Sequence, residues 1–223
     1  MKFKYLSIDP LVVLVDDFLD TKSSRNLIEI SKPHLKRAFV SGTQEGIISD
    51  GRTCSNCYLT DNNYGEKLKR KLVLPISYLL NLNTDKAENI QVVHYSKKQK
   101  YDAHFDAFKL STETGKRNTK TGGQRLITAL IYLNNPEKGG ATFFPKLGIS
   151  VQAIQGRLLI FQNIGADVKI PHPSSIHAAL PLLKGEKWAV NIFFRTHSLK
   201  EEIEEIRFNV DNYLSTLNNK NRL

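Results

Sequence analysis

Residues 126–133, LITALIYL, form one of eight short runs rich in apolar, β-branched or aromatic residues between positions 90 and 195. Turn signals such as NNPEKGG at 134–140 separate the runs, and no helical pattern lies between them. This spacing predicts an antiparallel sandwich or barrel, a fold that often leaves a mouth for a ligand. The predicted strands cover residues 90–95, 104–109, 126–133, 141–144, 150–154, 157–161, 177–182 and 187–195.

The part of the chain before residue 90 carries helical patterns. Residues 8–19 are apolar and β-branched, which predicts an opening strand and a turn. Residues 20–38 predict a helix that Pro33 weakens, and residues 64–80 predict a second helix with a basic face. Because proline cannot donate a backbone hydrogen bond, we expect Pro75 to kink or interrupt this second helix.

A chain of 223 residues is expected to form one domain. Within it, residues 1–89 are predicted to support the fold, residues 90–197 to form the β core, and residues 198–223 to add a C-terminal helix. Residues 199–219 show an apolar stripe at helical spacing. The stripe either covers the sheet or makes a dimer contact, so monomer and homodimer both remain open.

Residues 111–124, STETGKRNTKTGGQ, contain no large apolar side chain and predict a polar loop. A loop of this length inside a compact domain is usually either a functional lid or disordered.

The composition, with 40% hydrophobic and 24% charged residues, excludes a disordered or collagen-like chain. Asp9, Asp16 and Asp17 interrupt the N-terminal apolar residues, so no secretory signal is expected. No stretch approaches the roughly 18 apolar residues of a membrane-spanning helix. We therefore expect a cytoplasmic protein. Its formal net charge of +10 hints at an acidic partner, such as nucleic acid, a membrane surface or a protein.

Cys54 and Cys57 are the only cysteines and have the spacing C-x-x-C. The pair could be a redox motif or half of a zinc site. A structural zinc site needs four ligands, and no second cysteine pair exists. We expect two free thiols near a strand, which fits a reducing cytoplasm.

His104 and Asp106 form an H-x-D pair in a predicted strand, and side chains two residues apart on a strand point to the same face. His177 begins a later predicted strand that a rolled sheet can bring alongside. Two histidines and one carboxylate are the set that leaves open positions on Fe(II). Taken alone, an H-x-D pair is more often a surface or hydrogen-bonded pair. Of the other histidines, His172 is expected to be exposed, and His94 could be a core histidine.

Lys187 opens an otherwise largely apolar strand ten residues after His177. If its ammonium group is buried, it should have an anionic partner, and a ligand carboxylate is one candidate. Alternatively, the lysine lies at the edge of the strand and reaches water with its terminal amine.

Together these patterns resemble the catalytic domain of the prolyl 4-hydroxylases, which are Fe(II)- and 2-oxoglutarate-dependent dioxygenases. The resemblance runs from about Val13 to Arg195. The markers that carry it are Arg52-Thr53, residues 88–95, 99–101, 104–106, 125–134, 139–145, 156–163 and 177–188, and finally Asn191 and Arg195.

The resemblance implies a mainly β fold of the α+β type, with a double-stranded β-helix (jelly-roll) core and helices packed outside. It implies that His104, Asp106 and His177 hold Fe(II). Lys187 resembles the lysine that pairs with the far carboxylate of 2-oxoglutarate and assists catalysis.

Four further roles follow from the resemblance. Tyr95 and Thr142 match positions that hydrogen-bond 2-oxoglutarate. Arg125 matches a position near the peptide substrate, and Trp188 matches a residue beside the iron site. The chain departs from the family pattern at positions such as Ala141, Leu180 and Phe193, which bear on substrate preference and leave the ligand set intact.

The implied reaction is that of a procollagen-proline 4-dioxygenase-like oxidoreductase. It uses Fe(II), O2 and 2-oxoglutarate, with ascorbate, to hydroxylate a prolyl residue of a peptide or protein, and it releases succinate. The competing readings are the same chemistry on a lysyl residue, a small molecule or a nucleobase, a non-catalytic basic jelly-roll binding protein, and a zinc hydrolase.

The basic clusters refine what the net charge indicates. Two of them, at 97–100 and 116–120, flank the predicted metal strand, and a third lies on the helix at 67–71. A basic rim around an iron site fits an acidic protein or peptide and a dianionic cosubstrate. Neither nucleic acid nor a membrane is therefore the expected partner.

Overall fold

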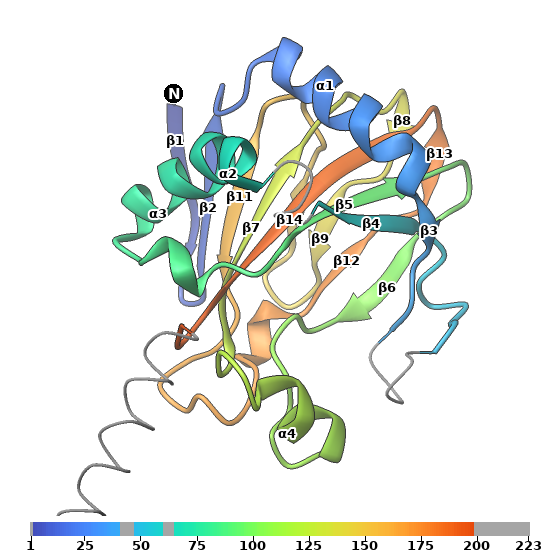
Figure 1. The fold of residues 1–223 in the computed structure, drawn as a ribbon. Coiled ribbons are helices and arrows are strands. Elements are labelled where there is room, and N and C mark those ends of the chain that lie inside the picture. The colour runs from blue at the N-terminus through green and yellow to red at the C-terminus, as the bar shows by residue number, and fades with distance from the viewer. Residues whose placement is uncertain (1, 41–46, 60–64, 199–223) are drawn as a thin grey trace, which may run out of the picture.

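The computed structural model describes residues 2–40, 47–59 and 65–198, and the strands within them form three sheets (Figure 1). The main sheet has the order β1-β2-β11-β7-β14-β5-β4-β3, and a second sheet has the order β10-β9-β12-β6. In the main sheet the bounds are β1 Lys2–Ile8, β2 Leu11–Asp16, β11 Leu158–Gln162, β7 Arg125–Tyr132, β14 Lys187–Arg195, β5 Ile90–Tyr95, β4 Ser55–Leu59 and β3 Lys36–Arg37. In the second sheet they are β10 Ile149–Val151, β9 Thr142–Phe144, β12 His177–Ala179 and β6 Tyr101–His104, and the remaining pair is β13 Leu182–Lys184 with β8 Lys138–Gly139.

The helices α1, α2 and α3 lie together on the main sheet, whereas α4 lies apart from them at the other end of the molecule (Figure 1). Their bounds are α1 Thr21–Ser31, α2 Gly65–Leu68, α3 Leu74–Leu80 and α4 Glu113–Thr119, with 3-10 turns at Lys32–His34, Thr84–Lys86 and Pro173–Ser175 and a π-helical turn at Lys69–Val73. No helix in the described ranges is long and apolar enough to cross a membrane.

The main sheet is buried on both faces. On one face Val15, Val190 and Phe194 pack with the helix residues Leu27 and Ile76. On the other face a second cluster fills the space toward the four-stranded sheet, with members such as Val93, Tyr132, Phe144 and Leu159. Because successive strand residues point to opposite faces, the strands β2, β11, β7, β14 and β5 each contribute to both clusters. The predicted mainly β architecture with helices outside is confirmed.

Residues before position 90 are part of the main sheet itself. Strand β2 pairs with β11, so that Leu14 lies opposite Leu159, and β4 pairs with β5, so that Cys57 lies opposite Val92. The predicted C-terminal helix at 199–219 lies outside the described residues.

Several predicted boundaries are wrong. The strand expected at 104–109 is β6, which ends at His104, and the chain bends after it. The run at 177–182 divides into β12 and β13 around Pro181, which has no N–H for a sheet. The predicted loop at 111–124 contains α4, which begins where the Thr112 hydroxyl accepts a hydrogen bond from the Gly115 N–H at 3.0 Å.

The helical run predicted at 64–80 is interrupted, as expected, near Pro75. A π-helical turn precedes α3, and the Leu74 N–H bonds to the Lys69 carbonyl. Proline supplies no N–H, so the chain passes it with a wider turn in place of a regular α-helix.

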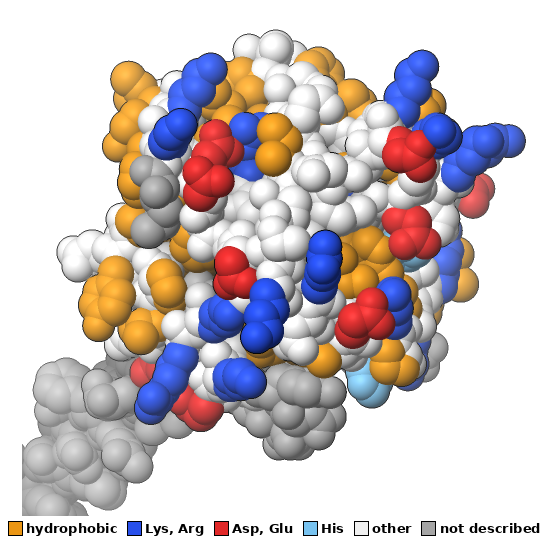
Figure 2. All heavy atoms as spheres, turned by 90° about the horizontal axis from the view of Figure 1, so that it is seen from above, with side chains coloured by type: hydrophobic (Ala, Val, Ile, Leu, Met, Phe, Trp, Pro, Cys, Tyr) orange, Lys and Arg blue, Asp and Glu red, His pale blue; other side chains and the backbone are white. Residues whose placement is uncertain are grey.

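Surface charge is mixed on the face seen in Figure 2, where Lys and Arg side chains are interspersed with Asp and Glu. In the basic cluster of the second helical run, Lys69 Nζ lies 3.9 Å from Asp85 Oδ1 and Lys71 Nζ lies 3.5 Å from Asp20 Oδ2. Exposed pairs of this kind contribute little to stability, but they offset the positive field of the cluster.

Candidate metal centre

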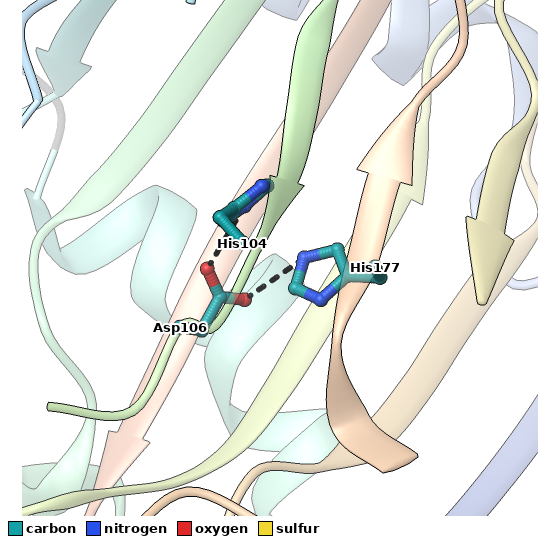
Figure 3. Close-up of side chains that lie close together, drawn as sticks. All are labelled: His104, Asp106 and His177. Carbon is teal, nitrogen blue, oxygen red and sulfur yellow. Dashed lines mark ion pairs between the residues drawn. The ribbon is translucent and has the colours of Figure 1, made fainter. Parts of the chain in front are cut away.

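His104, Asp106 and His177 come together at the end of the four-stranded sheet (Figure 3). One potential ligand atom from each side chain lies within 4.8 Å of the others. Asp106 Oδ1 is 3.6 Å from His104 Nε2, and Asp106 Oδ2 is 3.5 Å from His177 Nε2. The three predicted ligands therefore surround a single point.

The strand of His177 lies beside that of His104, as expected, but Asp106 is placed differently from the expectation. Strands β6 and β12 are antiparallel, and His177 is the register partner of His104. Asp106 is not on the strand, because β6 has already ended, and the bend at residues 105–107 turns its carboxylate back toward both rings. Strand pairing thus positions the histidines, and the bend positions the aspartate.

Backbone carbonyls fix the orientation of both imidazoles. His104 Nδ1 lies 2.8 Å from the Asp102 carbonyl, and His177 Nδ1 lies 3.0 Å from the Ser175 carbonyl. A carbonyl can only accept a hydrogen bond, so each Nδ1 carries the proton and each Nε2 presents a lone pair to the centre. This arrangement is typical of metal-binding histidines.

The protonation states also suit a cation. Burial lowers the pKa of His177 to about 4, so its ring is neutral at pH 7. Burial alone would raise the pKa of Asp106, but the neighbouring His177 and His104 outweigh it and hold that pKa well below its usual range. At neutral pH Asp106 therefore offers a carboxylate and His177 offers an imidazole lone pair.

Aromatic rings enclose the cluster. Tyr101 stacks on His104 with a centroid distance of 3.5 Å, while Phe161 and Phe144 lie 4.6 Å and 5.6 Å from the His177 ring. An apolar shell of this kind limits access of water to a metal site. Phe161 on β11 and Phe144 on β9 have no fixed spacing from the ligands, so the sequence did not predict them, whereas Tyr101 lies on β6 with His104.

Lys187 lies in the same cavity, which has a volume of about 800 Å³. Its side chain is 2% exposed, so it does not reach water at the strand edge. The ammonium lies 5.2 Å from the Tyr95 ring centroid and 5.5 Å from that of Tyr132, and it has no ion-pair partner in residues 2–40, 47–59 and 65–198. Burial lowers the pKa of Lys187 to about 8. The part of the chain that the structure describes therefore does not supply the anion that this lysine was expected to have.

Tyr95 and Thr142 also line the cavity. The Tyr132 hydroxyl donates a hydrogen bond to Thr142 Oγ1 at 2.7 Å, and both side chains are buried. Because Thr142 accepts this bond, its own hydroxyl hydrogen can be directed at a bound molecule.

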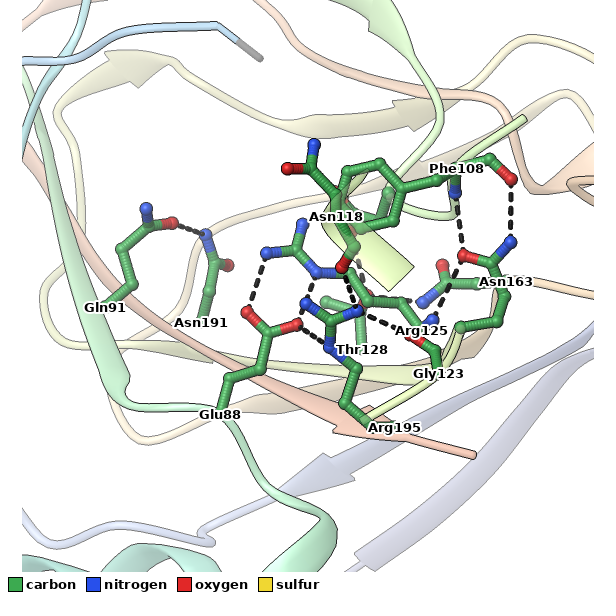
Figure 4. Close-up of polar contacts among 12 residues, drawn as sticks. Glu88, Gln91, Phe108, Asn118, Gly123, Arg125, Thr128, Asn163, Asn191 and Arg195 are labelled. Carbon is green, nitrogen blue, oxygen red and sulfur yellow. Dashed lines mark hydrogen bonds and ion pairs between the residues drawn. The ribbon is translucent and has the colours of Figure 1, made fainter. Parts of the chain in front are cut away.

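Arg125 lines the opposite end of the cavity and belongs to a network of charged groups (Figure 4). Its guanidinium donates twice to Glu88, at 2.7 Å and 2.8 Å, and lies 3.6 Å from the centroid of Phe193. Arg195 also pairs with Glu88, and its Nη1 donates to the carbonyl of Asn118 in α4 at 2.9 Å. The network therefore ties the cavity wall to the α4 segment.

Trp188, which was predicted to lie beside the iron site, faces the other way. Its ring packs in the core under the helices, 4.3 Å from the ring of His94, and its Nε1 donates to Glu186 at 3.1 Å. Since Lys187 points into the cavity, the next residue on the strand must point out of it. Phe193, six positions after Lys187, lines the cavity instead.

Two other predictions concern residues outside the cluster. His172 is not exposed as expected, because its side chain is only 16% exposed and Nε2 lies 3.2 Å from Asp9 Oδ1. Cys54 and Cys57 are both buried free thiols, which confirms that prediction.

Residues 90–195 match the model of the 2OG-Fe(II) oxygenase superfamily. Two Arabidopsis thaliana proteins, prolyl 4-hydroxylase 2 and prolyl 4-hydroxylase 5, are 33% and 30% identical, over 88% and 87% of this chain and 71% and 72% of their own lengths.

Solved structures show the same fold. The viral collagen prolyl hydroxylase of Paramecium Bursaria Chlorella virus-1, in its 2OG complex, aligns with a TM-score of 0.65 at 23% identity, over 82% of this chain and 95% of that chain. A Trichoplax adhaerens prolyl hydroxylase aligns with a TM-score of 0.60 at 15% identity, over 82% and 83% of the two chains. The expected jelly-roll core is confirmed by these alignments. The chain belongs to the prolyl 4-hydroxylase family of the 2OG-Fe(II) oxygenase superfamily.

Proposed function

We propose that this protein is an Fe(II)- and 2-oxoglutarate-dependent dioxygenase that hydroxylates a prolyl residue of a peptide or protein and converts 2-oxoglutarate to succinate. One observation carries the proposal. A cluster of two histidines and a carboxylate shares its cavity with a buried lysine that has no anionic partner among the described residues. This pairing calls for both a metal and an acidic small molecule.

His104, Asp106 and His177 would hold the iron. Imidazole nitrogen and carboxylate oxygen suit Fe(II), and three protein ligands leave further positions open. Bound Fe(II) supplies the oxygen chemistry that couples decarboxylation of 2-oxoglutarate to hydroxylation of a C–H bond. The protein contributes preset ligands and an apolar enclosure that keeps other reactions out.

Lys187 would bind the far carboxylate of 2-oxoglutarate. A charge-assisted hydrogen bond in a dry cavity is about twice as strong as a neutral one, and it relieves the cost of the buried ammonium. Tyr95 and Thr142 supply hydroxyl groups at the same end. The dianion is thus oriented with its far end on the lysine, and its reactive end is directed at the metal cluster.

The peptide would enter at the end lined by Arg125 and Phe193. Phe193 is held flat beneath the Arg125 guanidinium, which Glu88 keeps in place. A rigid aromatic face and a fixed cation together suit a proline ring followed by a backbone carbonyl.

Three finer points belong to the same proposal. Ascorbate serves as the reductant, as the family resemblance implies. The compartment is the cytoplasm, in keeping with two cysteines that are buried as free thiols. The protein is a monomer or a homodimer.

A peptide panel tests the substrate assignment. The full chain is loaded without oxygen with Fe(II) and 2-oxoglutarate, then exposed to oxygen with proline-rich, acidic proline-containing and lysine-containing peptides. Mass spectrometry should find one added oxygen on proline and none on lysine, and His104→Ala should give no product. Rapid succinate formation without oxidised proline would point to another substrate class, and no succinate at all would favour a non-catalytic binding protein.

A further inference from the structure

A chain of buried hydrogen bonds leads away from Asp106. The Thr128 hydroxyl lies 2.8 Å from Asp106 Oδ2, and Asn163 Nδ2 lies 2.9 Å from Thr128 Oγ1 (Figure 4). Thr128 is 1% exposed and Asn163 is fully buried. Thr128 lies on β7 and Asn163 follows β11 directly, so the main sheet reaches the metal cluster through these two side chains.

The chemistry of Asn163 and Asp106 determines which atom donates in each of these hydrogen bonds. The amide Nδ2 of Asn163 can only donate, so the Thr128 oxygen accepts from it. The Asp106 carboxylate can only accept, so the Thr128 hydrogen must point to Oδ2. With its hydroxyl both donating and accepting, Thr128 has one orientation, and its hydrogen bond restrains Oδ2 of the carboxylate.

Asn163 also acts on His177 through its backbone. Its carbonyl accepts a hydrogen bond from the His172 N–H at 2.9 Å and shares the hydrogen of Ser175 Oγ, which lies 3.2 Å from it and 2.8 Å from the His172 carbonyl. The carbonyl of Ser175 in turn accepts from His177 Nδ1 at 3.0 Å. Asn163 is therefore joined to two of the three members of the cluster, to Asp106 by its side chain and to His177 by its backbone.

The side chain of Asn163 carries a cost to stability. Its Oδ1 is buried and has no hydrogen-bond partner among the described residues. A buried acceptor without a partner is destabilising, and an apolar residue of similar size would avoid the penalty. The benefit that offsets this cost must come from the other end of the amide, where Nδ2 meets Thr128.

We infer that Asn163 and Thr128 are positioning residues for the metal, and that their hydrogen bonds hold the Asp106 carboxylate in its ligating orientation. The inference rests on the proposed function, because it takes His104, Asp106 and His177 as the metal ligands. Groups that orient a ligand from behind typically change metal affinity about 10- to 100-fold when removed.

Metal titration tests the inference without turnover. Mn(II), which is stable in air, is titrated into the metal-free full-length protein, and its dissociation constant is measured together with the thermal unfolding midpoint. Thr128→Val keeps the shape but removes the hydroxyl, and we expect the dissociation constant to rise about 10- to 100-fold. Thr128→Ser restores the donor and should return the constant to within about threefold of the original. Ser31→Ala is the matched control, since it removes a buried hydroxyl that donates to the Leu27 carbonyl in α1, away from the metal cluster.

Asn163→Leu and the double variant separate positioning from a general loss of stability. Because both side chains act through one carboxylate, the losses of Asn163→Leu and Thr128→Val should not multiply in the double variant. If Thr128→Val failed to fold, the Asn163→Leu variant, which keeps the Thr128 hydroxyl, would test the inference through its own Mn(II) dissociation constant. Wild-type Mn(II) affinity in a folded Thr128→Val or Asn163→Leu protein would overturn the inference. Absence of Mn(II) binding by the wild type would instead overturn the proposed metal site.

Discussion

His104 and His177 are directly opposed in the β6–β12 pair, and their ring centroids lie 4.4 Å apart. Two strands distant in sequence thus bring two imidazoles to one point before any metal binds. Because backbone carbonyls hold both Nδ1 atoms, little reorganisation is needed when a cation enters.

Lys187→Met should have opposite effects on binding and on stability. The shift of the Lys187 pKa from 10.5 to about 8 corresponds to about 3 kcal/mol of penalty for the buried charge. Removing the charge should raise the free energy of unfolding of the ligand-free protein by about 1–3 kcal/mol. It should also raise the KM for 2-oxoglutarate strongly. Urea unfolding and steady-state kinetics check both, and unchanged affinity for 2-oxoglutarate would refute the role of Lys187.

The same lysine predicts a pH dependence. In the ligand-free protein it loses its charge as pH rises through about 8, so the dissociation constant for 2-oxoglutarate should increase about tenfold per pH unit above that value. Between about 8 and 10.5 the unfolded chain binds more protons than the folded one, so this group makes stability rise with pH. Binding and unfolding curves, each compared with those of Lys187→Met, isolate both contributions. If the dissociation constant and the free energy of unfolding changed with pH equally in the wild type and in Lys187→Met, the assignment of this pH dependence to Lys187 would be contradicted.

Glu88→Gln should weaken the peptide end of the cavity. It leaves the guanidinium of Arg125 buried without its anion, which typically costs about 3 kcal/mol. We expect a higher KM for peptide with little change in the KM for 2-oxoglutarate. The control Glu113→Gln breaks an exposed pair with Lys116 and should leave both constants and the melting temperature unchanged.

Trp188 and Phe193 should behave differently when mutated. Trp188→Phe alters the core under the helices, so it should lower the melting temperature and leave the KM values for both substrates unchanged. Phe193→Ala removes an aromatic face from the cavity and should raise the KM for peptide. A change in peptide KM for Trp188→Phe alone would reverse the assignment of the two faces of β14.

The sequence predicted best those elements whose residues are buried on both faces. Strands β5 and β14 occur at the predicted bounds of 90–95 and 187–195, because continuous apolar runs leave little ambiguity. The α4 helix was missed because residues 113–119 contain no apolar stripe. Such a helix depends on its Thr112 cap and on tertiary contacts such as the one between Arg195 and Asn118.

The metal cluster could be predicted and its surroundings could not. His104 and Asp106 form the H-x-D pair and the family resemblance adds His177, whereas Thr128 and Asn163 reach the cluster only through the pairing of strands. Trp188 was placed wrongly because its expected role beside the iron came from the family resemblance alone. That expectation did not take the position of its neighbour Lys187 into account. The alternation of side chains along a strand already places residues 187 and 188 on opposite faces.

The most direct test compares succinate and hydroxyproline formed by the iron-loaded full-length protein with a proline peptide. The account predicts equal amounts from the wild type. It predicts neither product from His104→Ala, Asp106→Ala or His177→Ala, and wild-type amounts from the control His34→Ala, which removes an exposed histidine outside the cluster. Hydroxyproline formation that survived loss of any of the three ligands, or a wild type that makes succinate but never hydroxyproline, would contradict it.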